Sequence, residues 1–384
     1  MSTVSLPYRE FHANAFRGLR NVSLRDCTPI NLLVGDNNSG KTSLLEAMVL
    51  AGDPFSPDQW RLATQVRGTW PLVDPPVKGV ATSRLGPIEW MFPRAEGWEF
   101  GEISIDISGT CPLRFLRVLA QKVVGAPPSV ALVTPGRIVE GVFQSESSSI
   151  DGLSLNVRAS SDIDREQPRL PSGFEECQLV MWEQEGRSGA EPKPHPRVGF
   201  ATPVSHRSDG YLAIRAGQLL REATKQATLS LVQCVDSKIS DFWVGDPSIG
   251  SGDSLEDAKP QLHVDYESYG SVPIHSLGDG LRRVFHFAAL LEEVGQGGVV
   301  LIDEIEVGLH TTALKSVFRW LCQACLSREI QLFVTTHSLE AIDALVAADP
   351  GDHISLHRIQ SGRAQRYSGK LLRAARFELG QEVR

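Results

Sequence analysis

Two segments of the sequence carry side chains that are typical of phosphate chemistry. The first, GDNNSGKT at residues 35–42, fits the pattern G-x-x-x-x-G-K-[ST] and lies between an apolar run and a helical pattern. Glycines let such a loop curl until its backbone N–H groups face a phosphate, and the helix start adds positive potential. Lys41 would then reach the β- and γ-phosphates of a nucleotide, and the Thr42 hydroxyl would bind Mg²⁺. The alternative is a chance glycine-rich turn.

The second segment, GGVVLIDEIEVGLH at residues 297–310, places two carboxylates at the end of an apolar strand. Asp303 would hold Mg²⁺ and Glu304 would polarise an attacking water. The structural alternative is an Asp-Glu pair that caps a helix. A later strand ends in FVTTHS, and His337 there would lie at the sheet edge where ligands bind, within reach of a γ-phosphate.

The stretch HSLGDGLRRVF, residues 275–285, has two glycines spaced by one residue directly before a helical pattern. It is either a glycine-containing loop or one half of a nucleotide site. Asp279 would place a carboxylate near a triphosphate. One way to accommodate it is as a helix cap that pairs with Arg282 or Arg283 and points away from the nucleotide.

The elements that must position these residues alternate in a way that indicates a largely parallel sheet covered by helices. We expect strands at residues 30–35, 102–108, 153–159, 177–183, 261–268, 297–304 and 330–338, and helices at residues 41–51, 112–124, 209–244 and 281–295. The region 145–196 reads as long surface loops or an inserted sub-structure, and the tail reads as αβα. This pattern predicts an α/β fold.

Composition excludes several classes of protein. The chain has 384 residues, 41% of them apolar, and a net charge of −8. It contains no apolar run of membrane-spanning length and no signal-peptide pattern, so a cytoplasmic location without membrane contact is expected. Cys322 and Cys325 share a helical face and read as buried thiols. The acidic balance argues against general nucleic-acid binding, although residues 358–384 hold seven Lys and Arg and could contact DNA or form a solvated helix face.

The motifs GDNNSGKTSLLEA, LGDGLRR, LIDEIEVGLH and TTHS, in this order, resemble the ABC-type ATPase heads of the RecF, SMC and OLD-nuclease group. They look most like the stand-alone AAA-type ATPases of antiphage operons, such as the ATPase components of the PARIS and Septu systems. The resemblance implies a P-loop NTPase head with a mostly parallel sheet, an antiparallel β subdomain and a helical subdomain. It would form one composite domain over residues 1–384, with parts at 1–110, 111–208, 209–245, 260–345 and 346–384.

The resemblance also assigns roles, residue by residue. ATP and Mg²⁺ would be the cofactors, with Glu304, Lys41 and His337 catalytic and with Thr42 and Asp303 at the metal. The nucleotide would contact Gly35, Asn37, Asn38, Ser39, Gly40, Lys41 and Thr42 of one subunit. Ser276, Gly278 and Gly280 would face the phosphate of a partner subunit in a head-to-tail dimer, and Glu306, Gly308 and His310 would form the dimer-facing turn.

The sequence departs from the family pattern in two places. No glutamine can be assigned to the lid position that helps to hold Mg²⁺, although Gln59 and Gln65 are candidates. The 46 residues after Ser338 are too few for the Toprim nuclease of OLD proteins and lack its acidic clusters.

We therefore expect an ATP-hydrolysing dimeric switch that controls a separate effector, a nuclease or a toxin, in antiphage defence. A RecF-like DNA-binding ATPase of DNA repair is the alternative, and a transporter ATPase fits the motif spacing poorly.

Overall fold

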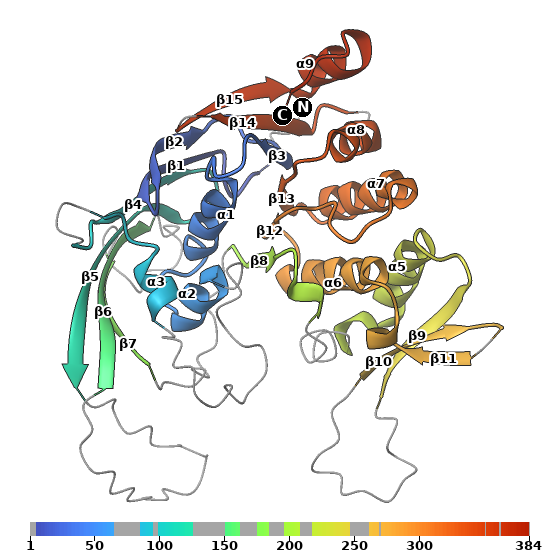
Figure 1. Cartoon of the computed structure of the whole chain (residues 1–384), viewed down its shortest axis with the longest axis horizontal. Coiled ribbons are helices and arrows are strands. Elements are labelled where there is room, and N and C mark those ends of the chain that lie inside the picture. The colour runs from blue at the N-terminus through green and yellow to red at the C-terminus, as the bar shows by residue number, and fades with distance from the viewer. Residues whose placement is uncertain are drawn as a thin grey trace, which may run out of the picture.

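In the part of the chain that the structure describes, three β-sheets and the helices that cover them make up the fold (Figure 1). The computed structural model describes residues 5–64, 85–94, 99–125, 150–161, 175–183, 196–207, 217–245, 261–268, 270–349, 351–360 and 362–383. Two of the sheets have six strands and the third has three.

The central sheet carries the ends of all the predicted chemical segments. Its order is β15-β14-β3-β13-β12-β8, and all of its strands run parallel except the edge strand β15. The strands are β3 (Ile30–Val34), β8 (Val198–Ala201), β12 (Val299–Ile302), β13 (Gln331–Thr335), β14 (Ile354–Gln360) and β15 (Arg363–Ser368). Every residue of β3, β12 and β13 is buried, as expected for parallel strands covered on both faces.

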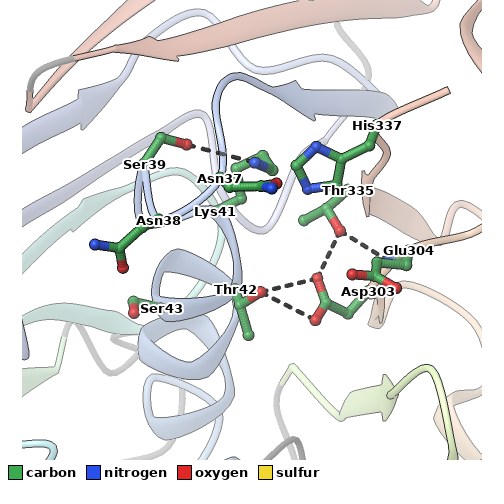
Figure 2. A pocket seen from close by; sticks show the side chains of 11 residues that line it. Asn37, Asn38, Ser39, Lys41, Thr42, Ser43, Asp303, Glu304, Thr335 and His337 are labelled. Carbon is green, nitrogen blue, oxygen red and sulfur yellow. Dashed lines mark hydrogen bonds between the residues drawn. The ribbon is translucent and has the colours of Figure 1, made fainter. Parts of the chain in front are cut away.

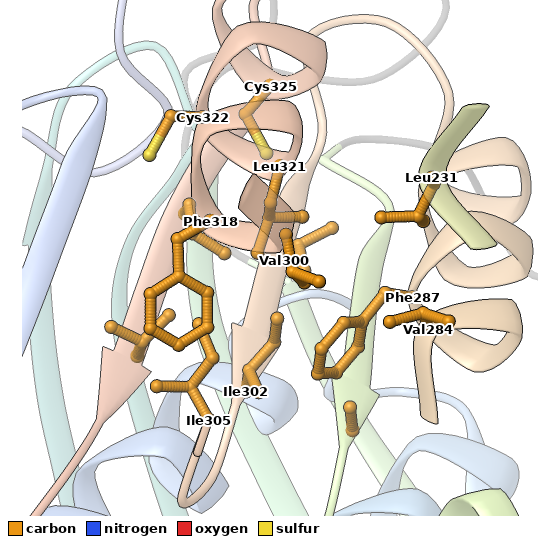
Figure 3. Packing of buried hydrophobic residues seen from close by; sticks show 14 of the residues in the cluster. Leu231, Val284, Phe287, Val300, Ile302, Ile305, Phe318, Leu321, Cys322 and Cys325 are labelled. Atoms are coloured by element: carbon orange, nitrogen blue, oxygen red, sulfur yellow. The ribbon is translucent and has the colours of Figure 1, made fainter. Parts of the chain in front are cut away.

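Alternate residues of these strands pack into two different cores. Val300, Ile302 and Leu332 face the helices α6 (Asp279–Val294), α7 (Thr311–Ser327) and α8 (Leu339–Ala348). Figure 3 shows this layer, in which Phe287 and Phe318 lie close to β12 and Cys322 and Cys325 sit as buried thiols on α7. Val299 and Leu301 face the opposite side and join the core of α1 (Lys41–Leu50).

The antiparallel sheet has the order β2-β1-β4-β5-β6-β7. It lies on the side of α1 that faces away from the central sheet (Figure 1). Its strands are β1 (Glu10–Phe16), β2 (Leu19–Leu24), β4 (Ile103–Ser108), β5 (Leu113–Gly125), β6 (Ile150–Ser161) and β7 (Glu175–Trp182). The short helices α2 (Pro57–Thr64) and α3 (Gly86–Glu89) pack beside it. Strands β6 and β7 come from the region predicted as surface loops or an insertion, and the rest of that region, apart from residues 183 and 196, lies outside the described residues.

The predicted helix at residues 112–124 is wrong, because this segment is β5. Val118 pairs with Ile103 of β4 on one side and with Val157 of β6 on the other. Leu116 and Val118 are buried at a spacing of two residues, which is the strand period. The strand satisfies its backbone through two neighbours, and this tertiary pairing overrides the helical appearance of the Leu and Ala positions.

The predicted helix at residues 209–244 is wrong after Gln233. The described part contains α5 (Glu222–Gln233), followed by β9 (Ile239–Gly245), and residues 209–216 lie outside the described residues. β9 forms a three-stranded antiparallel sheet with β10 (Gln261–Tyr266) and β11 (Gly270–Pro273). Asp236 accepts hydrogen bonds from the Lys238 amide and from the Tyr266 hydroxyl, so it fixes the turn between α5 and β9.

Short elements complete the chain. They are the 3₁₀ turns η3 (Ser205–Arg207) and η4 (Ile274–Ser276), the helix α9 (Gly369–Arg373) and the π-helical turn η5 (Ala374–Glu378). The tail after α8 thus contains a β14–β15 hairpin where the sequence predicted a single strand. Gly362 takes a φ of 75° in its turn, a conformation that suits glycine.

Candidate functional site

The phosphate loop, residues 35–42, connects β3 to α1 and depends on two glycines. Gly35 has a φ of 141°, and a Cβ there would overlap the Ile359 carbonyl oxygen of β14. Gly40 has a φ of 97°, and a Cβ would overlap the Leu19 side chain. Asn38 takes a φ of 64°, which asparagine tolerates better than most residues. The loop conformation therefore requires glycine at both positions, because neither position has room for a side chain.

Lys41 lies at the base of this loop with 5% of its surface exposed. Its Nζ donates to the carbonyl oxygens of Gly35 at 2.8 Å and Asp36 at 2.9 Å. Burial lowers the pKa of Lys41, and the nearby Asp303 carboxylate opposes that shift. The loop carbonyl groups thus hold the Lys41 ammonium group at the place where the phosphates of a nucleotide would bind.

A pocket of about 260 Å³ opens beside the loop (Figure 2). Its walls come from the loop, the first turn of α1 and the carboxyl ends of β12 and β13. The lining residues are Asn37, Asn38, Ser39, Gly40, Lys41, Thr42, Ser43, Asp303, Glu304, Thr335 and His337. The structure therefore brings together the residues predicted for the nucleotide site of one subunit, with the exception of Gly35. Gly35 contributes through its carbonyl contact with Lys41 and not through the pocket wall.

Thr42 and Asp303 are joined directly. The Thr42 hydroxyl lies 3.1 Å from Oδ1 and 3.0 Å from Oδ2 of Asp303, and it donates to that carboxylate. Thr335 donates to Oδ1 of Asp303 from the other side, at 2.5 Å. Sequence reasoning gave Thr335 no role. Its position at the end of a buried strand, next to the strand of the two acids, is the signal that could have identified it.

Glu304 follows with a φ of 48°, which is uncommon for a residue with a side chain. Its backbone N–H donates to Oγ1 of Thr335 at 2.8 Å. Burial, Asp303 and Glu306 raise the pKa of Glu304, whereas His337 and Arg283 act in the opposite direction. A carboxylate with a raised pKa is a better proton acceptor than an ordinary one, so the environment suits a general base.

His337 reaches the pocket from the end of β13 (Figure 2). Its backbone N–H donates to Oε1 of Glu306 at 3.0 Å. Two residues later α8 begins, with Ser338 as the N-cap whose hydroxyl accepts from the Ala341 N–H. The histidine is thus held between a strand end, a helix cap and a carboxylate.

Residues 276–280, called the signature segment below because they fall where the ABC-type signature motif would lie, do not line this pocket. Ser276 and Gly278 are exposed at the start of α6, and Gly278 is its N-cap. A Cβ at Gly280 would lie 2.8 Å from the carbonyl oxygen of Gly308, so this glycine permits a close backbone contact within the same chain. Any contact between Ser276 and a phosphate therefore requires a second copy or a rearrangement.

Asp279 has a partner that the sequence did not indicate. It accepts two hydrogen bonds from Arg207, at 2.7 Å and 3.1 Å, and these contacts lower its pKa. Arg282 is only a distant partner, 3.9 Å away, and Arg283 is buried in a different contact. The predicted pairing of Asp279 with Arg283 is therefore wrong. The predicted contact with Arg282 is present, but it is longer than the contact with Arg207.

The residues predicted for the dimer-facing turn and for the lid glutamine remain to be placed. Gly308 has a φ of 78° in the turn after the acids, and the His310 side chain caps α7 by accepting from the Thr312 N–H. Gln59 donates to the Val49 carbonyl oxygen from α2 and does not line the pocket. Gln65, the other lid candidate, lies outside the described residues.

The residues of the pocket fit a metal that is held partly by a nucleotide. No group of three or more His, Cys, Asp and Glu side chains suited to a metal occurs in the described part of the chain. A hydroxyl and a carboxylate, from Thr42 and Asp303, do converge. This sparse set is typical of Mg²⁺, which keeps several waters and phosphate oxygens as ligands.

Residues 211–343 match a family model described as "AAA domain, putative AbiEii toxin, Type IV TA system". The fold is that of a P-loop ATPase. The matched part of the chain contains the signature segment, both acids and His337. The phosphate loop precedes it in the chain and meets it in space at the pocket. The P-loop ATPase fold implies that a nucleotide binds together with a metal ion.

One curated relative is the uncharacterized protein MJECL11 of Methanocaldococcus jannaschii, with 34% identity over 70 residues. The match covers 18% of this chain and 60% of the relative, so it spans less than two thirds of that protein. Similar solved structures include an SmcHead bound to the C-winged helix domain of ScpA, at 12% identity and a TM-score of 0.45, covering 94% of this chain and 97% of that one. The SMC head domain from Thermotoga maritima has 11% identity and a TM-score of 0.39, with 94% and 99% covered.

In the described part of the chain, no helix has both the length and the apolar character needed to cross a membrane.

Proposed function

We propose that the protein binds and hydrolyses ATP with Mg²⁺ and acts as a dimeric switch. One observation carries the proposal: Thr42 of the phosphate loop contacts Asp303 at the end of β12, and Glu304 follows in the same pocket. This set of groups provides a phosphate cradle, two oxygen ligands for a metal and a carboxylate base. Phosphoryl transfer from a nucleoside triphosphate uses all of these groups.

Each residue has a distinct role in this proposal. Lys41 exchanges its carbonyl contacts for phosphate oxygens and offsets the negative charge of the transferring phosphoryl group. Thr42 and Asp303 hold Mg²⁺, which when bound neutralises charge on the phosphates. Glu304 orients the attacking water and accepts its proton at the carboxylate. His337 donates a hydrogen bond toward the γ-phosphate.

The exposed start of α6 supports a two-subunit site. Ser276 and Gly278 are accessible but outside the pocket wall, and they stand at a helix N-terminus, where anions are favoured. In a head-to-tail dimer, this segment of one copy would cover the nucleotide of the other. Binding of ATP would then close the two copies, and hydrolysis would release them.

Control of a separate effector, a nuclease or toxin, is the setting we propose, within antiphage defence in the cytoplasm. The family model is described as a putative toxin of a type IV toxin–antitoxin system, and the motifs resemble the PARIS and Septu ATPases. ATP-dependent capture of the protein encoded beside this gene would support the setting. Equal capture with and without ATP would contradict a nucleotide-driven switch.

Glu304→Gln tests the central proposal. We expect Mg²⁺-dependent hydrolysis to fall about 10²- to 10⁴-fold, because the base is lost, while the affinity for a fluorescent ATP analogue stays unchanged. Light scattering should show an ATP-dependent dimer of this variant. Adding Ser276→Arg to it should leave monomers that still bind the nucleotide. Wild-type hydrolysis by Glu304→Gln would show that the base is misassigned.

A RecF-like DNA-binding ATPase is a second candidate, favoured by a basic seam along β2 and β15. This seam consists of the exposed Arg20, Arg25, Arg363 and Arg366. The two strands lie side by side (Figure 1), and Arg366 Nε donates to the Asp26 carbonyl oxygen at 2.9 Å. These four exposed arginines contrast with the net charge of −8.

Duplex DNA binding that strengthens with ATP would support this second candidate. We expect it to weaken steeply between about 50 and 200 mM salt, because phosphate contacts release counterions. Replacing Arg363 and Arg366 by Gln should then weaken binding at least several-fold. The exposed Lys315 on α7, changed to Gln, is the control that should bind normally. Absence of binding at low salt would exclude this candidate.

A further inference from the structure

We infer that Arg283 is a positioning residue that sets the backbone of Glu304 and links it to the signature segment. The inference deepens the proposed function, because it concerns the residue assigned there as the base. Arg283 lies in the second turn of α6, four residues after Asp279. It does not line the nucleotide pocket, so it would act through Glu304 and not on the nucleotide.

The guanidinium of Arg283 binds three backbone carbonyl groups. Nη2 donates to the Glu304 oxygen at 2.6 Å and to the Asp303 oxygen at 3.0 Å, and Nη1 donates to the Thr202 oxygen at 3.0 Å. The side chain has no solvent exposure. Among the described residues, no carboxylate forms a salt bridge with it. The buried Arg283 guanidinium thus holds the backbone of Asp303 and Glu304, the two residues that follow β12.

The backbone it holds is in a costly conformation. Glu304 has a φ of 48°, and a side chain in this region costs free energy unless its surroundings enforce it. Here both sides of the residue are fixed. Thr335 Oγ1 accepts from the Glu304 N–H at 2.8 Å, and Arg283 donates to the Glu304 carbonyl oxygen. These two contacts determine the direction in which the Glu304 carboxylate leaves the chain.

A planar, forked donor is required for this geometry. Arginine can donate to several acceptors at once from a rigid group, whereas an ammonium group on a flexible stem acts as a single point charge. Burial lowers the pKa of Arg283 to about 10, and the carboxylates of Glu306, Asp303 and Glu304 oppose the shift. The residue therefore remains charged at neutral pH and keeps all of its donors.

The same face of α6 connects Arg283 to the surface. Asp279 pairs with Arg207, Arg282 Nη2 donates to the Arg207 carbonyl oxygen at 2.9 Å, and His286 hydrogen bonds with Ser205 at 3.1 Å. The helix start also contacts the turn after the acids through Gly280 and Gly308. A second copy that docks on Ser276 and Gly278 would thus press on a helix that is bonded to the Glu304 backbone.

The test compares Arg283→Lys and Arg283→Met in the full chain. We expect the affinity for a fluorescent ATP analogue to stay within about threefold of wild type, while single-turnover hydrolysis falls about a hundredfold in the Met variant and less in the Lys variant. In the Glu304→Gln background, Arg283→Lys should cause no further loss, because both changes act on one group. Arg376→Met, which removes an arginine that pairs with Asp343 and does not line the pocket, is the control.

Hydrogen exchange gives a second readout that does not depend on hydrolysis. The Glu304 amide should exchange faster in Arg283→Lys than in wild type without nucleotide, whereas amides of β13 should not change. Unchanged exchange at Glu304, equal losses in affinity and rate, or additive losses with Glu304→Gln would each overturn the inference. A wild-type chain that does not hydrolyse ATP would instead refute the proposed function and leave the exchange result to decide the positioning role. If the Met variant does not fold, the Lys variant carries both measurements.

Discussion

The hydroxyl of Thr335 serves two acidic residues at once. It donates to Asp303 Oδ1 and accepts from the Glu304 N–H. Because Thr42 occupies the other side of Asp303, the carboxylate is held in one orientation by hydroxyl groups from two different elements. A single side chain therefore fixes both the proposed metal ligand and the proposed base.

Thr335→Val should test this double role with almost no change in shape. It leaves the Asp303 carboxylate and the Glu304 N–H without this partner in a buried position, which costs about 1–3 kcal/mol of unfolding free energy. We expect a higher Mg²⁺ concentration for half-maximal hydrolysis, measured by titration, and lower stability in urea. The matched control is the neighbouring Thr336→Val, which loses only the hydrogen bond from the Ser338 N–H. An unchanged Mg²⁺ midpoint in Thr335→Val would contradict the role.

The site residues that sequence identified are those whose chemistry follows from local spacing. The residues within the loop at 35–42 are adjacent in the chain, and so are Asp303 and Glu304, so the residue types and their order identify each of these two segments. Thr335 and Arg283 could not be assigned in this way. Their roles depend on contacts across a strand pair and a helix, and on the left-handed conformation of Glu304, which no spacing reveals.

The first turn of α6 and its N-cap lie in two different environments. One face packs by backbone contact against the turn at Gly308, and the exposed end presents Gly278 to solvent. The two glycines of the signature segment therefore have different environments. Only Gly280 has a neighbour that a Cβ would meet.

Gly280→Ala and Gly278→Ala should separate these environments. The added Cβ at Gly280 would lie 2.8 Å from the Gly308 carbonyl oxygen, so the helix or the turn must shift, at a cost of about 1–3 kcal/mol. Gly278 has nothing within 4 Å of an added Cβ and a φ of −64°, so its change should be nearly neutral. Chemical denaturation of both variants checks this. Equal stability of the two would contradict the close contact.

Elements were predicted well where one side-chain period dominates. The buried strands β3, β12 and β13 and the amphipathic helix α6 agree with the sequence. β5 and β9 were predicted wrongly as helical, because the apolar and polar positions of both segments suit either period. Their strand form comes from partners far along the chain, such as β6 for β5 and β10 for β9.

At the scale of the whole molecule, a buried polar network joins three strands of the central sheet. Ser355 donates to Asn31 at 3.0 Å, Asn31 donates to the Leu332 carbonyl oxygen at 3.2 Å, and His357 hydrogen bonds with Ser355 at 3.1 Å. Burial lowers the pKa of His357 from 6.5 to about 4. The folded chain thus holds this histidine neutral at pH values where the unfolded chain protonates it.

Stability should consequently decrease as the pH falls from about 6.5 to about 4. In this window the unfolded chain binds more protons than the folded chain, so acid favours unfolding, and the effect is absent above pH 7. We expect His357→Gln to have a shallower decrease, measured as the free energy of unfolding at pH 7 and pH 5. The exposed His275, changed to Gln, should keep the wild-type dependence. An identical pH dependence in His357→Gln would contradict this assignment.

The place of β3 in the sheet has a consequence for how the chain is made. Residues 30–34 pair with β13 (Gln331–Thr335) on one side and with β14 (Ile354–Gln360) on the other, so both neighbours are synthesised long after β3. During synthesis, the phosphate loop therefore lacks both flanking strands until these two segments have left the ribosome. Since contacts between such distant segments form slowly, we expect the central sheet to form only then, with the apolar β3 segment exposed to chaperones in the interval.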